Sequence, residues 1–134
     1  MIWNISNDLQ ELTKLSEGLS AFGENANLPP SLIFEVTLAL EEIVTNIVSY
    51  GYDDDRKHLI SVRLEHQDNA FVITVEDDAK AFNPLSIPTP DLDASLSDRP
   101  IGGLGIHLVR RLMDNVTYQR EQGRNILVMT KKYE

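Results

Sequence analysis

Apolar residues near the start of the chain recur at the spacing of a helix. They form one stripe that consists of Leu9, Leu12, Leu15, Leu19 and Phe22. Residues three or four positions apart lie on the same side of a helix, so this stripe predicts an amphipathic helix. We expect Asn7 or Asp8 to cap its start, because short polar side chains accept from free backbone N–H groups, and Gly23 to end it.

A second helical pattern covers about residues 31–50 and is more strongly apolar. The linker before it ends in two prolines, Ser31 is the expected cap, and Gly51 is the expected end. One face carries Ile33, Val36, Leu40, Ile43 and Ile47, and another carries Glu35, Glu42, Asn46 and Ser49. This pattern predicts a long helix with one buried face and one polar face.

Residues 77–101 break the periodic pattern with prolines, aspartates and serines. A loop of this length in a small domain is usually functional or disordered. A third helix is predicted to follow it, with Ile106, Val109 and either Leu112 or Met113 on one face.

Two further stretches alternate between apolar and polar residues with a period of two, which predicts β-hairpins. The first places Ile60, Val62 and Leu64 before a turn at residues 67–70, and Phe71, Ile73 and Val75 after it. The second runs from Val116 to Glu121, turns at Gln122-Gly123 and returns over Asn125–Lys132. Residues 1–6 predict a short edge strand.

These elements predict an α+β fold: a two-layer sandwich with a mixed, mostly antiparallel sheet and helices on one face. A length of 134 residues suits one domain, so we expect a single domain over residues 1–134. There is no cysteine, which excludes a disulfide framework, a thiolate zinc site and a cysteine nucleophile.

The formal net charge of −9 argues against a broad nucleic-acid-binding face and against anionic membrane surfaces. A basic protein partner is compatible with this charge, and so is a role in solubility alone. No apolar run approaches the ~20 residues of a membrane span. The first six residues lack the basic and apolar regions of a secretory signal, so we expect a cytoplasmic protein.

Glu42 and Asn46 are four positions apart and therefore share one helix face. A carboxylate there can take a proton from an attacking hydroxyl group, and an Asn oxygen can bind Mg²⁺. Taken alone, such a pair is more often an ordinary polar face. Asp77, which follows a predicted strand, could accept a hydrogen bond from an adenine amino group, although taken alone it is more often a turn residue.

Gly102, Gly103, Leu104 and Gly105 open the third helix. Glycines let the backbone approach a ligand closely, and a helix start offers N–H groups to phosphate. A tight entry into the helix explains the glycines about equally well. The three histidines lack the spacing of metal ligands, and we interpret His107 as a partly exposed helix residue. The run Asp53–Asp55 lacks the spacing of a calcium loop, so we interpret it as solvated.

The order of these motifs resembles the Bergerat-fold, histidine kinase-like (GHKL) ATPases. The run from Ala39 to Asn46, continuing through Tyr50-Gly51-Tyr52, looks like the anti-sigma-factor serine/threonine kinases of the RsbW and SpoIIAB type. So does the run from Ile101 to Ile106 with its helix and closing hairpin. The resemblance covers almost the whole chain.

The resemblance implies an ATP-binding kinase that transfers the γ-phosphate to a serine of an anti-anti-sigma (STAS-type) protein and binds a sigma factor. Glu42 would be the general base, Asn46 the Mg²⁺ ligand, and Asp77 the residue that binds adenine. Phe82 and position 79 would lie at the nucleotide pocket. The glycine segment, namely Gly102, Gly103, Leu104 and Gly105, would shape the phosphate-covering region, with residues 84–101 as a lid that orders on ATP binding.

The sequence departs from the family pattern at Ala79, where the family has glycine. The added methyl group could weaken nucleotide binding, and a positive φ there would be strained. Asn125 stands where many relatives have threonine, and its side chain can replace that hydrogen bond.

Ala79 leaves a non-catalytic partner-switching protein as the alternative function. A histidine kinase module fits less well, because no helix pair with a phosphoacceptor histidine is evident before it. The family resemblance also implies a possible homodimer.

Overall fold

The computed structural model describes residues 1–86 and 103–133. Along the chain lie β1 (Ile2–Ser6), α1 (Glu11–Asn25), α2 (Pro30–Tyr50), β2 (Leu59–Gln67), β3 (Ala70–Asp77), the 3₁₀ turn η1 (Pro84–Ser86), α3 (Gly103–Leu112), β4 (Asn115–Glu121) and β5 (Arg124–Lys132). The predicted helices and both predicted hairpins are therefore confirmed. Of the predicted lid, only η1 belongs to the described residues, and the remainder, with Gly102, lies outside them.

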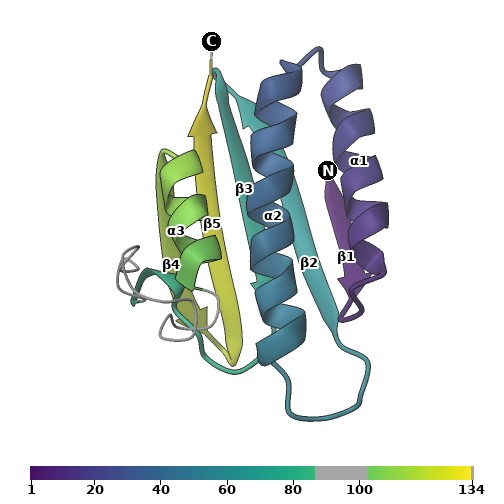
Figure 1. Cartoon of the computed structure of the whole chain (residues 1–134), viewed down its shortest axis with the longest axis vertical. Coiled ribbons are helices and arrows are strands. Elements are labelled where there is room, and N and C mark those ends of the chain that lie inside the picture. The colour runs from purple at the N-terminus through teal and green to yellow at the C-terminus, as the bar shows by residue number, and fades with distance from the viewer. Residues whose placement is uncertain (87–102, 134) are drawn as a thin grey trace.

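The described strands form one sheet in the order β1-β2-β3-β5-β4, and each pairing in it is antiparallel. The three helices cover one face of this sheet, with α1 over β1, α2 over the centre and α3 over β4 and β5 (Figure 1). This arrangement confirms the two-layer sandwich, with β1 at an edge as expected.

Both hairpin turns have central residues with positive φ. Asp68 and Asn69 have φ values of 53° and 60°, and Gln122 and Gly123 have φ values of 52° and 77°. Two-residue turns of this kind match the twist of antiparallel strands. They fix the register of β2 with β3 and of β4 with β5.

The core lies between the sheet and the helices. Alternate residues of β3 point inward, and the last inward residue of that strand is Asp77. The same holds in β5, where Asn125 begins the inward series. The buried apolar residues of the three central strands are Ile60, Val62, Leu64, Phe71, Ile73, Val75, Leu127 and Met129. At one end of this apolar layer, two polar side chains thus take core positions.

The helix ends differ from several expectations. α1 begins at Glu11, because Asp8 instead closes the preceding turn by accepting from the Gln10 N–H at 2.9 Å. Leu9 lies before the helix and is exposed. α1 continues past Gly23 to Asn25, and Gly23 lies where α1 and α2 meet.

A Cβ atom at Gly23 would lie 2.5 Å from Ile33 Cγ1, so this glycine serves close helix packing rather than helix ending. Ser31 is not a cap, since α2 already begins at Pro30. Proline is suited to the first helical position because it has no N–H to satisfy. The end of α2 at Gly51 is as predicted.

Within the described residues, no helix has the length and apolar character needed to cross a membrane.

Candidate functional site

A cavity of about 650 Å³ opens between the last turns of α2, the ends of β3 and β5, and α3. Its apolar wall is formed by Ile43, Ile47, Val75, Ile106 and Leu127. Polar side chains reach it from several elements, among them Asn46 from α2, Asp77 from β3 and Asn125 from β5. A mainly apolar cavity with a few convergent polar groups is typical of a small-molecule site.

Asp77 is the buried acidic group of this cavity, with 3% of its surface exposed. Its Oδ1 accepts hydrogen bonds from Asn125 Nδ2 and from the Ala79 N–H, both at 2.9 Å. Its Oδ2 takes part in no hydrogen bond among the described residues. Burial raises the pKa of Asp77, and the two hydrogen bonds to Oδ1 oppose that rise. Because only Oδ1 is engaged, Oδ2 is open to a donor on a ligand.

Asn125 lies directly across from Asp77 in the pairing of β3 with β5. Besides its bond to Asp77, its Nδ2 donates to the carbonyl of Lys80 at 2.8 Å. Its Oδ1 accepts from Arg120 Nη1 at 3.0 Å and from the Tyr118 hydroxyl group. With its donors and acceptor engaged, Asn125 fixes which oxygen of Asp77 is open.

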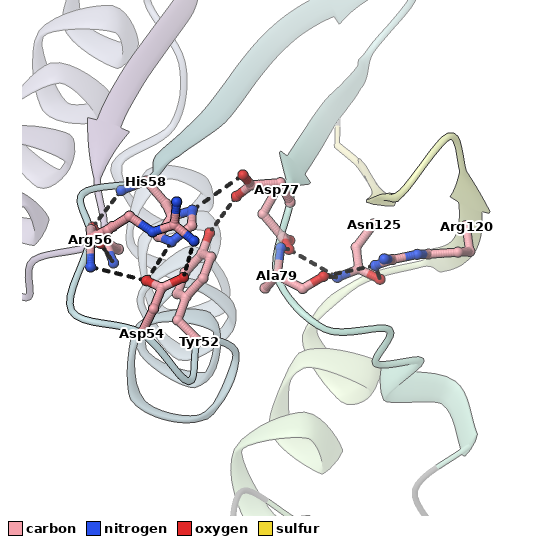
Figure 2. Close-up of polar contacts among 10 residues, drawn as sticks. Tyr52, Asp54, Arg56, His58, Asp77, Ala79, Arg120 and Asn125 are labelled. Carbon is pink, nitrogen blue, oxygen red and sulfur yellow. Dashed lines mark hydrogen bonds and ion pairs between the residues drawn. The ribbon is translucent and has the colours of Figure 1, made fainter.

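Arg120 extends this network around the segment after β3. Its Nη1 also donates to the carbonyl of Ala79 at 2.8 Å, so one guanidinium group holds both Asn125 and the backbone at Ala79 (Figure 2). We did not identify Tyr118 and Arg120 as site residues from the sequence. They lie on β4, and only the register between β4 and β5 brings them to Asn125.

Ala79 is buried and lines the cavity. It is not among the described non-glycine residues with positive φ, so its backbone lies in a region that alanine adopts without strain. Its Cβ faces Gly51 at the end of α2, where an added Cβ would lie only 2.8 Å away. Gly51 therefore makes room for the methyl group of Ala79.

The polar face of α2 meets the start of α3. Asn46 Nδ2 donates to Glu42 Oε1 at 3.3 Å, which leaves the Asn46 Oδ1 as an acceptor. A Cβ atom at Gly105 would lie 1.7 Å from Glu42 Oε1, so the Glu42 carboxylate lies against the first turn of α3. Both α2 side chains thus lie between the cavity and the helix start.

The structure brings most of the predicted site residues together. Asn46, Asp77, Ala79 and Phe82 line the cavity, and Phe82 is 41% exposed at its rim. Gly103 and Leu104 lie at the start of α3, next to the Gly105 that contacts Glu42. Among the described residues, no group of three His, Asp or Glu side chains could hold a metal ion by itself.

The residues present fit ATP with Mg²⁺. The open Oδ2 of Asp77 suits the amino group of adenine, because a buried acceptor without a partner is costly. The apolar walls suit the faces of a base. The Asn46 Oδ1 suits Mg²⁺, a hard cation that takes most of its other ligands from water and phosphate.

The chain is similar to known proteins over most of its length. A family model described as a histidine kinase-like ATPase domain matches residues 5–131. The serine/threonine-protein kinase BtrW of Bordetella bronchiseptica is 32% identical over 99 residues, which cover 74% of this chain and 70% of that protein. An anti-sigma F factor of Clostridium acetobutylicum is 28% identical over 116 residues, which cover 80% of this chain and 76% of that protein.

Solved structures show the same fold. The RsbU and RsbW domains of Rv1364c from Mycobacterium tuberculosis match with a TM-score of 0.65 at 15% identity, over 98% of this chain and 32% of that one. The histidine kinase domain of a blue-light activated kinase from Erythrobacter litoralis matches with a TM-score of 0.58 at 15% identity, over 92% of this chain and 60% of that one. This chain thus spans less than two thirds of both solved chains.

Proposed function

Because the chain belongs to the family of histidine kinase-like ATPase domains, we propose that it is an ATP-dependent protein serine/threonine kinase that acts as an anti-sigma regulator. The observation that carries this proposal is the buried carboxylate of Asp77, with one oxygen open at the wall of an apolar cavity. Relatives named as a serine/threonine kinase and as anti-sigma F factors support the choice within the family.

In this proposal Asp77 binds the adenine amino group through Oδ2, and Phe82 borders the base. Asn46 Oδ1 is the ligand that this chain offers to Mg²⁺, which neutralises phosphate charge when it is bound. Gly103, Leu104 and Gly105 at the start of α3 would offer backbone N–H groups to the phosphates.

Glu42 is the general base of the proposed transfer. It accepts the proton of the substrate serine hydroxyl while the serine oxygen bonds to the γ-phosphorus of ATP. The bond from that phosphorus to the β–γ bridging oxygen breaks, and ADP leaves. The contact with Gly105 supports this role, because it places the carboxylate beside the proposed phosphate-binding turn.

The proposed partners are a sigma factor and an anti-anti-sigma protein of the STAS type, the latter supplying the serine. The anti-sigma F factors among the relatives support the first partner. A cytoplasmic location and a homodimer are part of the same proposal.

The alternative is a partner-switching protein without catalysis, and the methyl group of Ala79 in the cavity wall is the observation that favours it. The negative φ of Ala79 and the space at Gly51 weigh against it. With both, the methyl group of Ala79 fits without moving the segment from Asp77 to Lys80, which would bind the base.

Calorimetric titration with ATP and Mg²⁺ tests the binding site. In Asp77→Asn, the Oδ1 still serves Asn125 and Ala79, so an NH₂ group replaces the open Oδ2. We expect an affinity loss of about 10- to 100-fold, because a hydrogen bond to a charged group contributes ~1.5–3 kcal/mol. A folded wild-type protein that binds no ATP would instead establish the non-catalytic alternative.

Transfer of γ-labelled phosphate to the anti-anti-sigma protein of the same organism tests the base. Glu42→Gln should slow transfer by about 10²- to 10⁴-fold while ATP affinity stays near that of the wild type. Glu41→Gln is the matched control, because Glu41 accepts from Ser16 Oγ at 3.0 Å on the side of α1. Equal rates in the Glu42→Gln variant and the wild type would rule out the assigned base.

A further inference from the structure

A second polar cluster lies on the opposite side of the segment that follows β3. At its centre, His58 Nε2 lies 2.8 Å from Asp54 Oδ1 (Figure 2). The other ring nitrogen, His58 Nδ1, lies 3.2 Å from Asp78 Oδ2. A neutral imidazole has one N–H donor and one acceptor nitrogen. Because both ring nitrogens face carboxylate oxygens, this arrangement requires the doubly protonated, positively charged ring.

Tyr52 completes the cluster. Its ring stacks on the His58 ring with centroids 4.1 Å apart and an interplanar angle of 17°. Its hydroxyl group donates to Asp78 Oδ1 at 3.2 Å. Both oxygens of Asp78 are therefore engaged, one by His58 and one by Tyr52. The hydrogen bonds that His58 donates to Asp54 and Asp78 raise the pKa of His58 above its ordinary value of 6.5.

The cluster is attached to the strand layer through the backbone of His58. The His58 N–H donates to Asn7 Oδ1 at 2.9 Å, and the Asn7 N–H donates to the His58 carbonyl at 3.0 Å. Asn7 directly follows β1. Asp78 is thus held to the sheet edge through His58, on the side away from Asn125.

The segment from Asp77 to Lys80, which begins at the end of β3, is held by hydrogen bonds on two sides. On the cavity side, Asn125 contacts Asp77 and Lys80. On the other side, the Lys80 N–H donates to the Gly51 carbonyl at 3.0 Å, and His58 and Tyr52 hold Asp78. Asp77 and Asp78 are adjacent in the chain, so a change in the position of Asp78 is transmitted directly to Asp77.

We propose that His58 is a positioning residue for nucleotide binding, which in its charged form holds Asp78 and thereby keeps the open oxygen of Asp77 aimed at the cavity. It follows that ATP affinity decreases as His58 loses its proton. This inference rests on the proposed ATP site and adds a pH dependence to it. Loss of the proton leaves one ring nitrogen with a lone pair facing a carboxylate, and that contact becomes repulsive.

His58 is the group of the cluster that changes charge near neutral pH. The titratable groups that face it or border it are Tyr52, Asp53, Asp54, Arg56, Asp77, Asp78 and Lys80. Burial raises the pKa of Tyr52, so its hydroxyl group stays neutral over this range. The charged form of His58 is complete below pH 6.5 and is lost as the pH rises through its raised pKa.

The test measures ATP affinity by calorimetry from about pH 6 to about pH 9 for the wild type and His58→Gln. At the acid end we expect the wild type to bind about fivefold more tightly, and this ratio should approach one at the alkaline end. Taking the ratio removes the ionisation of ATP and of Asp77, which both proteins share. His66→Gln is the matched control, since His66 stacks on Tyr133 instead, and should match the wild type at every pH.

Asp78→Asn supplies a second variant in case His58→Gln does not fold. It removes one of the two charged partners, so the pKa of His58, followed by NMR of its ring protons, should fall toward its ordinary value. The pH at which affinity declines should fall with it. A ratio that does not change with pH, or a decline that Asp78→Asn leaves in place, overturns the role of His58 while ATP binding stands. Absence of ATP binding in the wild type at every pH overturns the proposed function as well.

Discussion

The adenine-binding role that we propose for Asp77 comes with a cost to the stability of the fold. Burial raises its pKa, so the folded state binds a proton more strongly than the unfolded chain does. A raised pKa contributes stability below the ordinary value of 3.8, and this contribution is lost as the pH rises through the raised pKa. At neutral pH, where Asp77 is ionised, the folded protein is therefore less stable than it would be with a neutral side chain at this position.

We accordingly expect Asp77→Asn to raise the urea midpoint of unfolding at pH 7, although it weakens ATP binding. The Asn Oδ1 keeps both hydrogen bonds that Asp77 Oδ1 accepts. Asp78→Asn is the contrasting control: despite some burial, hydrogen bonds from His58 and Tyr52 lower the pKa of Asp78, so its loss should lower the midpoint. A lower midpoint for Asp77→Asn would contradict this account.

The contact between Gly51 and Ala79 gives a second residue-scale prediction. A Cβ at position 51 would lie 2.8 Å from Ala79 Cβ and 2.5 Å from the Ile47 carbonyl oxygen. Gly51→Ala should therefore lower the unfolding free energy by about 1–3 kcal/mol, the usual range for overpacking. Ala79→Gly should relieve part of this loss in the double variant, because it removes one of the two clashes. If the changes in unfolding free energy of the two single variants, measured by urea unfolding, simply add up in the double variant, the two residues do not interact.

At the residue scale, the motifs predicted Glu42, Asn46 and Asp77 as site residues, and the family resemblance added positions 79 and 82. Asn46, Asp77, Ala79 and Phe82 do line one cavity. The motif residues could be singled out because each stands at a fixed offset from a strand end or from a partner on the same helix face. Neither the Tyr118 and Arg120 contacts nor the pairing of His58 with Asp54 could be predicted, and we interpreted Asp54 as part of a solvated turn. Such contacts depend on strand register and on the path of a loop, which a single segment of sequence does not contain.

The contact between α2 and α3 is the element-scale feature of the site. Alanine is favoured over glycine within a helix by about 1 kcal/mol, yet a Cβ at Gly105 would lie 1.7 Å from Glu42 Oε1. The Glu42 carboxylate is the far end of a flexible side chain and can move aside. We therefore expect Gly105→Ala to keep the thermal midpoint near that of the wild type but to reduce phosphate transfer by about 10-fold or more.

Leu108→Ala is the control for Gly105→Ala, because Leu108 is exposed on the same helix. It should leave transfer unchanged. Unimpaired transfer by Gly105→Ala would mean that Glu42 does not need its present position against α3.

The elements themselves were largely predictable, and their ends were not. Hydrophobic periodicity is repeated over many residues, so it identified three helices and two hairpins. A helix end depends on one or two residues and on what packs beside them. Gly23 was expected to end α1, but it serves the contact with Ile33. Ser31 was expected to cap α2, but that helix already begins at Pro30, with Pro29 at the cap position.

For the whole molecule, the shifted groups predict a stability maximum on the acid side of neutrality. The pKa values of Glu11, Asp54 and Asp78 are lowered by hydrogen bonds, so their contributions are lost as the pH falls below about 4. The contribution of His58 is lost as the pH rises above 6.5. Urea midpoints measured across this range should therefore peak below pH 7 and decline toward pH 8.5, with a smaller decline in His58→Gln. A midpoint that rises steadily to pH 8.5 would contradict this.

The register of β3 and β5 also constrains how the chain can change in evolution. Asp77 and Asn125 continue the inward series of their strands, so core and site share one alternation of side chains. Deleting or inserting a single residue within either strand would turn the apolar residues and the site residue to the opposite faces together. Length variation near this site should therefore be confined to the loops among homologues, and a library of single-residue deletions should recover no functional β3 or β5 variants.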